Sequence, residues 1–410
     1  MNLTRADQQS GGPTYCCPAI SAHGRYVAFE SEATDLVAGD TNEVNDVFVR
    51  DRLTGDTTRI SVATDEDQSN GGSSAPSMSN SGQVVAFMSD ATNLVPGDTN
   101  GVTDIFLRDL TAGTTVRVSL TSNGNQANDT SGDPVISGNG RQISFISDAT
   151  NIVPGDTNGL VDVFVRNRSG TVTDRVSVSS TEDQGDERSF GPAISRTGRF
   201  VAFTSAATNL VAADTNDSFD VFLRDRETGK TERVSVGPGG REGVGGSPFD
   251  TGFAETVSGD GRYVTFDSDQ SNLVERDTND NFDAFVRDRK SERTTLVSRD
   301  AEGDQIQGLT FLASSDRRAG SVLLLSYDEN VVPGDDNGLE DLFVRDRRTG
   351  DVGLVTIAVR GEQTDDALGG GTMSTDGSHV TFLSFATNLV PNDTNGEGDI
   401  FVRDDAADLR

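Results

Sequence analysis

Apolar residues recur along the chain in short runs that have the spacing of β-strands. In residues 76–120, Val84-Val-Ala-Phe-Met-Ser89 and Asp104-Ile-Phe-Leu-Arg-Asp109 are apolar on both faces, which indicates strands that are covered on both sides. Shorter strands are predicted at Pro76–Ser79 and Thr115–Leu120, with glycine-containing turns nearby. Because turns this short join antiparallel neighbours, the segment predicts a four-stranded meander with strands a, b, c and d.

This unit recurs seven times. The first Asp of its Asp-Thr-Asn loop returns at intervals of 58, 58, 58, 63, 58 and 58 residues, and seven such units account for all 410 residues. A sheet that is apolar on both faces cannot stand alone, whereas radial stacking covers every face. The sequence therefore predicts an all-β fold, a seven-bladed β-propeller of four-stranded antiparallel blades in a single domain, residues 1–410.

The two ends of the chain predict how the ring closes. By register, Met1-Asn-Leu-Thr4 matches Arg59-Ile-Ser-Val62, which is a d strand, and the last c strand is predicted at Asp399-Ile-Phe-Val-Arg403. We therefore expect the N-terminal strand, residues 1–6, to complete blade 7, so that no sheet edge stays open.

The units have the form Pro-Ala-Ile-Ser-x-x-Gly-Arg-Tyr-Val-Ala-Phe, then Thr-Asn-Leu-Val-Pro-Gly-Asp-Thr-Asn-Gly, then Asp-Val-Phe-Val-Arg-Asp-Arg-x-Thr-Gly, as in residues 18–55 and 192–229. They resemble the TolB-type, WD-like β-propeller repeat family over essentially the whole chain. The resemblance implies the propeller fold, although TolB itself has six blades. It implies function only broadly, because such propellers serve as periplasmic scaffolds, binding modules and non-catalytic domains of peptidases.

The net charge of −32 changes the list of partners. An acidic surface repels nucleic acid and anionic membranes, so we expect neither, and we expect a monomer that prefers cations or basic partners. No segment is apolar enough to enter a membrane, and the first residues lack the apolar core of a signal peptide. The expected location is extracytoplasmic (secreted or periplasmic), with the leader absent from this chain. A cytoplasmic protein of a halophile is the alternative, since only two of the 34 basic residues are lysines.

The long b–c and d–a connections leave the blades on one face, where the extra residues of each unit must lie. The b–c loop repeats an Asp, an Asn two residues later and a second Asp six residues after the first, and the d–a loop repeats a Gln, replaced by Glu242 in the fifth unit. Such oxygen donors suit calcium, but Asp and Asn also build Asx-turns without any metal, and both interpretations remain open. The candidate metal ligands are Asp40, Asn42, Asp46, Asp98, Asn100, Asp104, Asp156, Asn158, Asp162, Asp214, Asn216, Asp220, Asp277, Asn279, Asp283, Asp335, Asn337, Asp341, Asp393, Asn395 and Asp399.

The repeated arginines of the units, the two cysteines and the two histidines are all explained by structural roles. Each c strand carries an arginine that we expect to form an ion pair between blades, with a ring of cationic ligands as the alternative: Arg50, Arg108, Arg166, Arg224, Arg287, Arg345 and Arg403. Cys16 and Cys17 are interpreted as simple thiols, with a disulfide between these neighbours as the alternative. His23 and His379 fall on or near the short-turn face, and no catalytic motif is present, so no catalytic residue is assigned.

Two classes of function follow. The main expectation is a non-catalytic, TolB-like binding or scaffold module, not an enzyme, that presents its long-loop face to a protein or glycan ligand. The acids recur equally in all seven units, whereas a catalytic centre needs different residues from different blades. The alternative is a propeller enzyme of the lactonase or lyase kind, or the propeller part of a larger hydrolase system.

Overall fold

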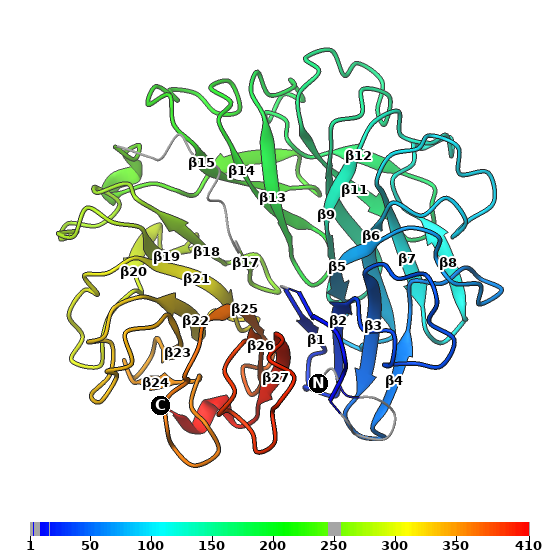
Figure 1. Ribbon diagram of the computed structural model, residues 1–410. Helices are drawn as coiled ribbons and strands as arrows, with labels where there is room; N and C mark the ends of the chain where they lie inside the picture. The colour runs from blue at the N-terminus through cyan, green and yellow to red at the C-terminus, as the bar shows by residue number, and fades with distance from the viewer. Residues whose placement is uncertain (1–2, 4–8, 16, 245–255, 410) are drawn as a thin grey trace.

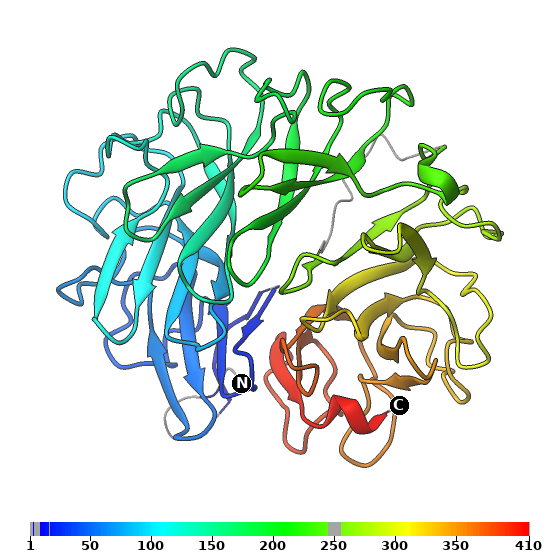
Figure 2. The same cartoon turned by 180° about the vertical axis from the view of Figure 1, so that it is seen from behind.

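The protein is a ring of seven antiparallel sheets, as the sequence predicts (Figure 1). This computed structural model describes residues 3, 9–15, 17–244 and 256–409. Within these residues, six sheets have four strands and the seventh has three, and the strands of each sheet follow one another in chain order. Figure 2 shows the ring from behind, and the last described element, η2 (Ala406–Leu409), contacts β23 (Asp341–Asp346) and β24 (Val352–Leu354) of blade 6.

The first four blades are contiguous along the chain. Blade 1 consists of β1 (Ala19–Ile20), β2 (Tyr26–Ser31), β3 (Asp46–Asp51) and β4 (Asp56–Arg59). Blade 2 consists of β5 (Ser73–Met78), β6 (Val84–Ser89), β7 (Asp104–Asp109) and β8 (Thr114–Arg117). Blade 3 consists of β9 (Ser131–Ile136), β10 (Gln142–Ser147), β11 (Asp162–Asn167) and β12 (Thr173–Arg175). Blade 4 consists of β13 (Ser189–Ile194), β14 (Phe200–Ser205), β15 (Asp220–Asp225) and β16 (Lys230–Arg233), followed by the short 3₁₀ helix η1 (Pro238–Gly240).

The remaining blades follow the same plan. Blade 5 consists of β17 (Thr256–Val257), β18 (Tyr263–Ser268), β19 (Asp283–Asp288) and β20 (Arg293–Leu296). Blade 6 consists of β21 (Thr310–Ser315), β22 (Ser321–Ser326), β23 (Asp341–Asp346) and β24 (Val352–Leu354). Blade 7 consists of β25 (Leu368–Met373), β26 (Val380–Ser384) and β27 (Asp399–Arg403), and the 3₁₀ helix η2 (Ala406–Leu409) follows it.

In six of the seven blades, the two central strands are joined by a stacked cross-strand pair of phenylalanines. In blade 2, Phe87 lies opposite Phe106 in the register, and their ring centroids are 5.9 Å apart. Equivalent stacked pairs occur in blades 1, 3, 4, 5 and 7. Blade 6, whose b strand departs from the repeat, places Leu324 opposite Phe343. These pairs bury large apolar area on one face of each sheet, which drives the next blade to pack against it.

The hydrophobic core consists of seven clusters, one between each pair of neighbouring blades. The cluster between blades 2 and 3, for example, joins Ile105 and Leu107 to Ile143 and Phe145. The ring is closed in the same way, since Phe29 of blade 1 belongs to a cluster with residues of blade 7. Each blade is therefore covered on both faces, which explains why its central strands are apolar throughout.

The a–b turns fit closely under the neighbouring blade. Gly82 has a φ of +73°, a left-handed conformation that favours glycine, and an added Cβ would lie 2.2 Å from the ring of Tyr26 in blade 1. Glycine is thus required at this turn for two reasons, backbone conformation and the close approach of the aromatic ring.

The described part of the N-terminal segment contacts the acidic loop of blade 7. Gln9 Nε2 donates hydrogen bonds to Asp393 Oδ1 at 2.6 Å and to Asp399 Oδ2 at 2.8 Å. Leu3 forms an isolated bridge with Gln9, as Val62 does with Gln68. Most of the predicted strand, residues 1–6, lies outside the described residues.

The predicted register of that segment is wrong by one residue, because Leu3 and not Thr4 is the equivalent of Val62. The reason is an extra residue in strand a of blade 1. Thr14 pairs with Ser31 and Ala19 with Ala28, five positions apart, whereas Ser73 and Ser77 take the same places in blade 2 only four positions apart.

Two further expectations concern cysteine and arginine. Cys17 is bonded in a disulfide, so the interpretation as simple thiols is wrong for it, while Cys16 lies outside the described residues. The c-strand arginines do connect blades. Arg108 and Arg224 form the expected ion pairs, with Glu66 and Glu182, and several of these arginines also donate to backbone carbonyls of the preceding blade. Arg108 Nη1 donates to Ala63 O at 3.2 Å, and Arg166 Nη1 donates to Leu120 O at 3.0 Å. In the described part of the chain, no helix is long and apolar enough to span a membrane.

Candidate functional site

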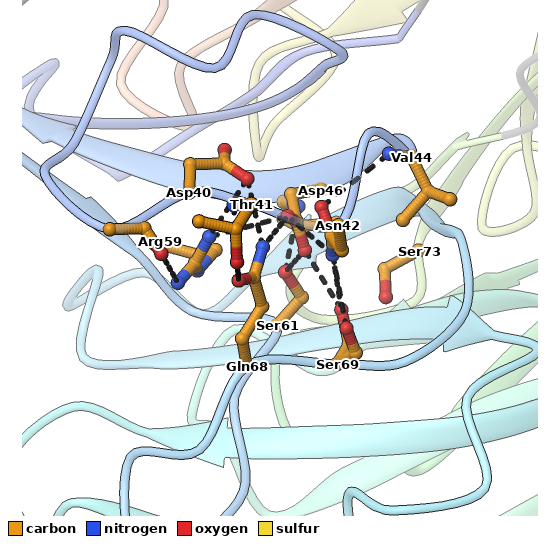
Figure 3. A network of polar contacts seen from close by, with 12 residues as sticks. Asp40, Thr41, Asn42, Val44, Asp46, Arg59, Ser61, Gln68, Ser69 and Ser73 are labelled. Carbon is orange, nitrogen blue, oxygen red and sulfur yellow. Dashed lines mark hydrogen bonds and ion pairs between the residues drawn. The ribbon is translucent and has the colours of Figure 1, made fainter.

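The repeated acidic loop of blade 1 is a compact network around one buried carboxylate (Figure 3). Asp46, the first residue of β3, is fully buried. Its Oδ1 accepts hydrogen bonds from Ser61 Oγ and, at 2.9 Å, from Ser69 Oγ. Its Oδ2 accepts one from Asn42 Nδ2 at 3.1 Å. A buried carboxylate is costly unless it is hydrogen-bonded and paired, and this network supplies the hydrogen bonds.

A glutamine from the d–a loop joins the two repeated acids. Gln68 Nε2 donates to Asp40 Oδ1 at 2.8 Å and to Asp46 Oδ2 at 3.4 Å. Its Oε1 accepts from Thr41, from the backbone N at 3.3 Å and from Oγ1 at 3.2 Å. The recurring Gln of the sequence is thus part of the same cluster as the recurring Asp residues.

The repeated Asn forms the Asx-turn that one of the two sequence interpretations requires. In blade 1, Asn42 Oδ1 accepts a hydrogen bond from Val44 N at 3.4 Å. The same contact to the residue two positions later is made by Asn158, Asn216, Asn279, Asn337 and Asn395. Turn chemistry is therefore present in six loops. Binding of a metal by these loops is a separate matter and stays a prediction.

In blades 1–4 a buried arginine from the end of strand d enters the cluster. Arg117 Nη2 lies 3.2 Å from Asp98 Oδ2, and its Nη1 lies 3.1 Å from Asp104 Oδ2. The equivalent residues in the other three blades are Arg59, Arg175 and Arg233. Our sequence reasoning missed them, although each stands 13 positions after the second Asp of its unit. At the same offset, blades 5 and 6 have Leu296 and Leu354.

Blade 4 brings a third carboxylate to this arginine. Carboxylate oxygens of Asp214, Asp220 and Glu242 lie within 4.8 Å of one another, close enough to hold a metal ion. However, Arg233 Nη1 already lies 3.1, 2.8 and 2.7 Å from these three groups. Burial, then the charges of Asp220 and Glu242, raise the pKa of Asp214 to about 7 even though Arg233 lowers it. A guanidinium and a metal ion would compete for this position.

Blades 5 and 6 hold the two acids without arginine, in different ways. In blade 5, Gln305 Nε2 donates to both Asp277 Oδ1 and Asp283 Oδ2 at 2.8 Å. Burial and the charge of Asp277 nevertheless raise the pKa of Asp283 to about 6. In blade 6, Gln363 Nε2 instead donates to the backbone oxygen of Gly334.

The predicted ligands therefore come together within each blade and not across blades. In each loop the first Asp, the Asn and the second Asp lie at the start of strand c. The Gln of the d–a loop donates to the acids in blades 1, 3, 5 and 7, whereas in blades 2 and 6 it donates to a backbone oxygen. Residues outside the motif also make the loops unequal, since the loops of blades 1–4 contain an arginine and those of blades 5 and 6 do not.

A second difference between blades lies on the same face, at the ends of the central strands b and c. We call the inner rim the residue after each b strand and the residue before each c strand. In blades 1–3 these positions are polar or aliphatic: Glu32, Asn45, Asp90, Thr103, Asp148 and Val161. In blades 4–7 each blade has one aromatic residue at these positions: Ala206, Phe219, Asp269, Phe282, Tyr327, Glu340, Phe385 and Gly398.

The aromatic side chains of the inner rim are partly exposed, and two of them contact phenylalanines on the a strands β13 and β21. Phe219 contacts Phe190 of β13 edge to face, with centroids 5.2 Å apart, and Phe282 lies 5.8 Å from Phe311 of β21. Tyr327 is 53% exposed and Phe385 is 42% exposed. Phe190, Phe219, Phe282 and Phe311 are half-buried. Partly exposed aromatic side chains on one face of a protein are typical of ligand sites.

One rim pair joins a phenol to a carboxylate. A side-chain hydrogen bond with Glu340, together with burial, raises the pKa of Tyr327 to about 12, so the phenol stays protonated. In blade 2 the equivalent positions are Asp90 and Thr103, where Thr103 Oγ1 donates to Asp90 Oδ1 at 2.5 Å. His23 does not belong to this face, since its Nδ1 lies 2.8 Å from Asp376 Oδ2 at the short turns.

Comparisons with known proteins bear on the fold. No family model matches the chain, and no curated protein matches it. Among solved structures, an oligogalacturonate lyase from Vibrio parahaemolyticus is similar with a TM-score of 0.56 at 10% identity, covering 100% of this chain and 97% of the lyase. The β-propeller domain of the Trilobed protease from Pyrococcus furiosus has a TM-score of 0.55 at 11% identity, covering 95% of each chain.

An acylaminoacyl peptidase from Pyrococcus horikoshii has a TM-score of 0.54 at 13% identity, covering 96% of this chain and 51% of the peptidase. A TolB structure from Acinetobacter baumannii reaches only 0.37, which is too low to carry an argument. These likenesses establish the propeller fold. The TolB-type resemblance is thereby supported as a propeller fold, without a match to a sequence family.

The expectation of a non-catalytic module that is not an enzyme is overturned by these comparisons. The similar structures are mostly propellers of enzymes, peptidases and oligogalacturonate lyases, which favours the alternative that we named. The physical basis of the expectation also fails, because it relied on seven equal loops. The loops and the inner rim both differ between blades.

Proposed function

We propose that the chain is a propeller enzyme that cleaves an oligosaccharide bound across the aromatic inner rim of blades 4–7. The single observation that carries this proposal is the concentration of partly exposed aromatic side chains there, opposite a polar rim in blades 1–3. Flat aromatic rings pack against the apolar faces of sugar rings, and rim carboxylates accept hydrogen bonds from sugar hydroxyls. Support also comes from the oligogalacturonate lyase, whose likeness spans nearly all of both chains.

The Tyr327–Glu340 pair has the chemistry for proton transfer in this site. Glu340 can accept a proton as a general base, and the protonated Tyr327 can donate one as a general acid. Cleavage of a glycosidic bond uses both transfers. The net charge of −32 favours substrates that are not acidic. A neutral or basic oligosaccharide approaches this surface without repulsion, whereas an acidic one requires a bridging cation.

The predicted location, metal, ligand class and oligomeric state are compatible with this proposal. An extracytoplasmic location is supported by the disulfide at Cys17, since disulfides persist in oxidising compartments. The manganese complex of an oligogalacturonate lyase supports a metal cofactor of some kind, and calcium in an acidic loop that lacks an arginine is the form we favour. Of the two expected ligands, protein and glycan, we propose a glycan on the long-loop face. We also propose that the protein is a monomer.

A panel assay tests the proposal. Neutral, amino-sugar and uronate oligosaccharides are incubated with the full chain, with and without divalent cations, and product is followed by reducing ends and by absorbance of unsaturated ends. We expect cleavage of at least one neutral or amino-sugar substrate, lost at least 100-fold in Glu340→Gln, which is in the usual range of about 10²–10⁴ for an acid–base residue. Thr103→Val at the equivalent position of blade 2 is the control and should retain activity. No cleavage in the whole panel would reject the proposal.

A second candidate is favoured by the peptidase likeness, which spans nearly all of this chain but only 51% of the peptidase. In that case the chain is the propeller part of a larger hydrolase system. It would bind substrate chains without cleaving them, and cleavage would appear only when the hydrolase is added.

A further inference from the structure

The acidic loop of blade 6 keeps the side-chain amide of Asn337 beside Asp341, but it lacks the arginine of blades 1–4 and the bridging glutamine of blade 5. Blades 1–4 place an arginine between the two acids, and blade 5 places Gln305 between them. Blade 6 has Leu354 at the arginine position. Its Gln363 turns away, since Nε2 donates to Gly334 O and Oε1 accepts from Asp336 N at 3.2 Å.

Two buried carboxylate oxygens of this loop consequently have no partner. Asp335 is 7% exposed and Asp341 is fully buried. Asp341 Oδ1 accepts hydrogen bonds from Thr356 and Thr364. Among the described residues, Asp335 Oδ1 and Asp341 Oδ2 have no hydrogen-bond partner. An unpaired buried oxygen costs free energy, and an uncompensated buried charge costs more, so this arrangement requires a ligand that supplies positive charge.

The surroundings make the need for positive charge greater. The charges of Glu329, Asp328 and Asp336 act on Asp335 in addition to that of Asp341. Among the residues that the structure describes, no lysine or arginine forms an ion pair with Asp335 or Asp341, in contrast to the loops of blades 1–4. All the available donors are oxygen atoms, which is the donor set of hard divalent cations such as calcium.

We propose that the acidic loop of blade 6 binds one calcium ion through Asp335 and Asp341, in the place that arginine occupies in blades 1–4. Arginine and calcium are thus two solutions to the same local problem, which is the neutralisation of two adjacent buried carboxylates. The loops with arginine have no need of the ion. This inference specifies the calcium binding named under the proposed function, and it does not depend on cleavage, because cation binding and oligosaccharide cleavage are measured separately.

Calorimetric titration of the full chain with calcium chloride, after removal of bound metal with a chelator, tests the proposal. We expect one site with a Kd on the order of 10⁻⁴ to 10⁻³ M, as in extracellular calcium modules. Leu354→Arg should abolish this site, since it introduces the guanidinium that the other blades use. The matched control is Leu296→Arg in blade 5, where Gln305 already satisfies both acids, and it should leave the calcium stoichiometry unchanged.

A second variant keeps the test decisive if Leu354→Arg fails to fold. Asp335→Asn removes one ligand without changing side-chain size, and it should weaken calcium binding at least tenfold. Calcium at 10 mM should also raise Tm by about 2 °C more than sodium chloride of the same ionic strength, and this difference should vanish in Asp335→Asn. Three results would overturn the proposal: no calcium binding, binding at several sites, or binding that survives both variants.

Discussion

The acidic loops of blades 2 and 6 share the same backbone motif and differ in what balances its charge. In blade 2, Arg117 contacts both Asp98 and Asp104, and all three side chains are buried. In blade 6, Leu354 takes the arginine position and two carboxylate oxygens are left without partners. The comparison shows that a repeated motif does not by itself define a repeated site. The residue that decides the chemistry comes from outside the motif, from strand d.

The largest effect is expected where the blade 2 arrangement is broken. Arg117→Leu gives blade 2 the residue of blade 6 and leaves two buried carboxylates uncompensated, which should lower the free energy of unfolding by about 3–5 kcal/mol. Urea denaturation measures it, with Arg117→Lys as a control that keeps the charge and should lose less. A loss below about 1 kcal/mol would mean that the buried ion pair has little net value in this loop.

A smaller effect is expected from the two glutamines that distinguish blades 5 and 6. Gln305→Ala removes donors from both Asp277 and Asp283, and should cost about 2 kcal/mol because buried acceptors lose their partners. Gln363→Ala removes only contacts to backbone groups and should cost about 1 kcal/mol. Equal losses in paired denaturation experiments would contradict the difference that we describe between these loops.

A comparison of sodium chloride with calcium should separate the general effect of charge screening on Tm from the effect of calcium binding in blade 6. At a net charge of −32 the folded chain repels itself, and sodium chloride screens this repulsion over a Debye length of about 10 Å at 0.1 M. Tm should therefore rise with sodium chloride by the same few degrees in the original chain and in Leu354→Arg, whereas the extra calcium effect should be confined to the original chain. A Tm that is flat from low to molar salt would argue against self-repulsion.

The smallest effect is expected at the opposite ends of the strands, where the charged pairs are more exposed. A bidentate hydrogen-bonded pair with Arg199 lowers the pKa of Asp225 to about 2. Because this folded-state pKa lies below the ordinary value of 3.8, the pair adds stability above pH 4 that is lost as the pH falls towards 2.

Arg199→Gln should make the loss of Tm between pH 4 and pH 2 slightly shallower and leave Tm near neutral pH almost unchanged. An effect as large as that of Arg117→Leu would contradict the contrast between exposed and buried pairs.

Local pattern alone was sufficient for the fold of this protein. The alternation of apolar strands such as Val84–Ser89 and Asp104–Asp109, and the constant interval between units, already require seven stacked sheets, because no other arrangement covers both faces of each one. The register of the repeats also placed the N-terminal segment beside blade 7, where Gln9 contacts Asp393 and Asp399, although the extra residue in strand a of blade 1 shifted the register by one.

The chemistry of the loops was decided by tertiary structure. Asp98 meets Arg117 and Asp40 meets Gln68 only when strand d and the d–a loop fold back beside the start of strand c, contacts that span 19 and 28 residues. The asymmetry of the inner rim likewise becomes a surface only when Phe190 and Phe219, or Phe282 and Phe311 of neighbouring blades, are brought together. Seven equal motifs indicate seven equal sites as long as only sequence neighbours are compared. Burial and long-range charge make them unequal, because both depend on which side chains other strands place beside the motif.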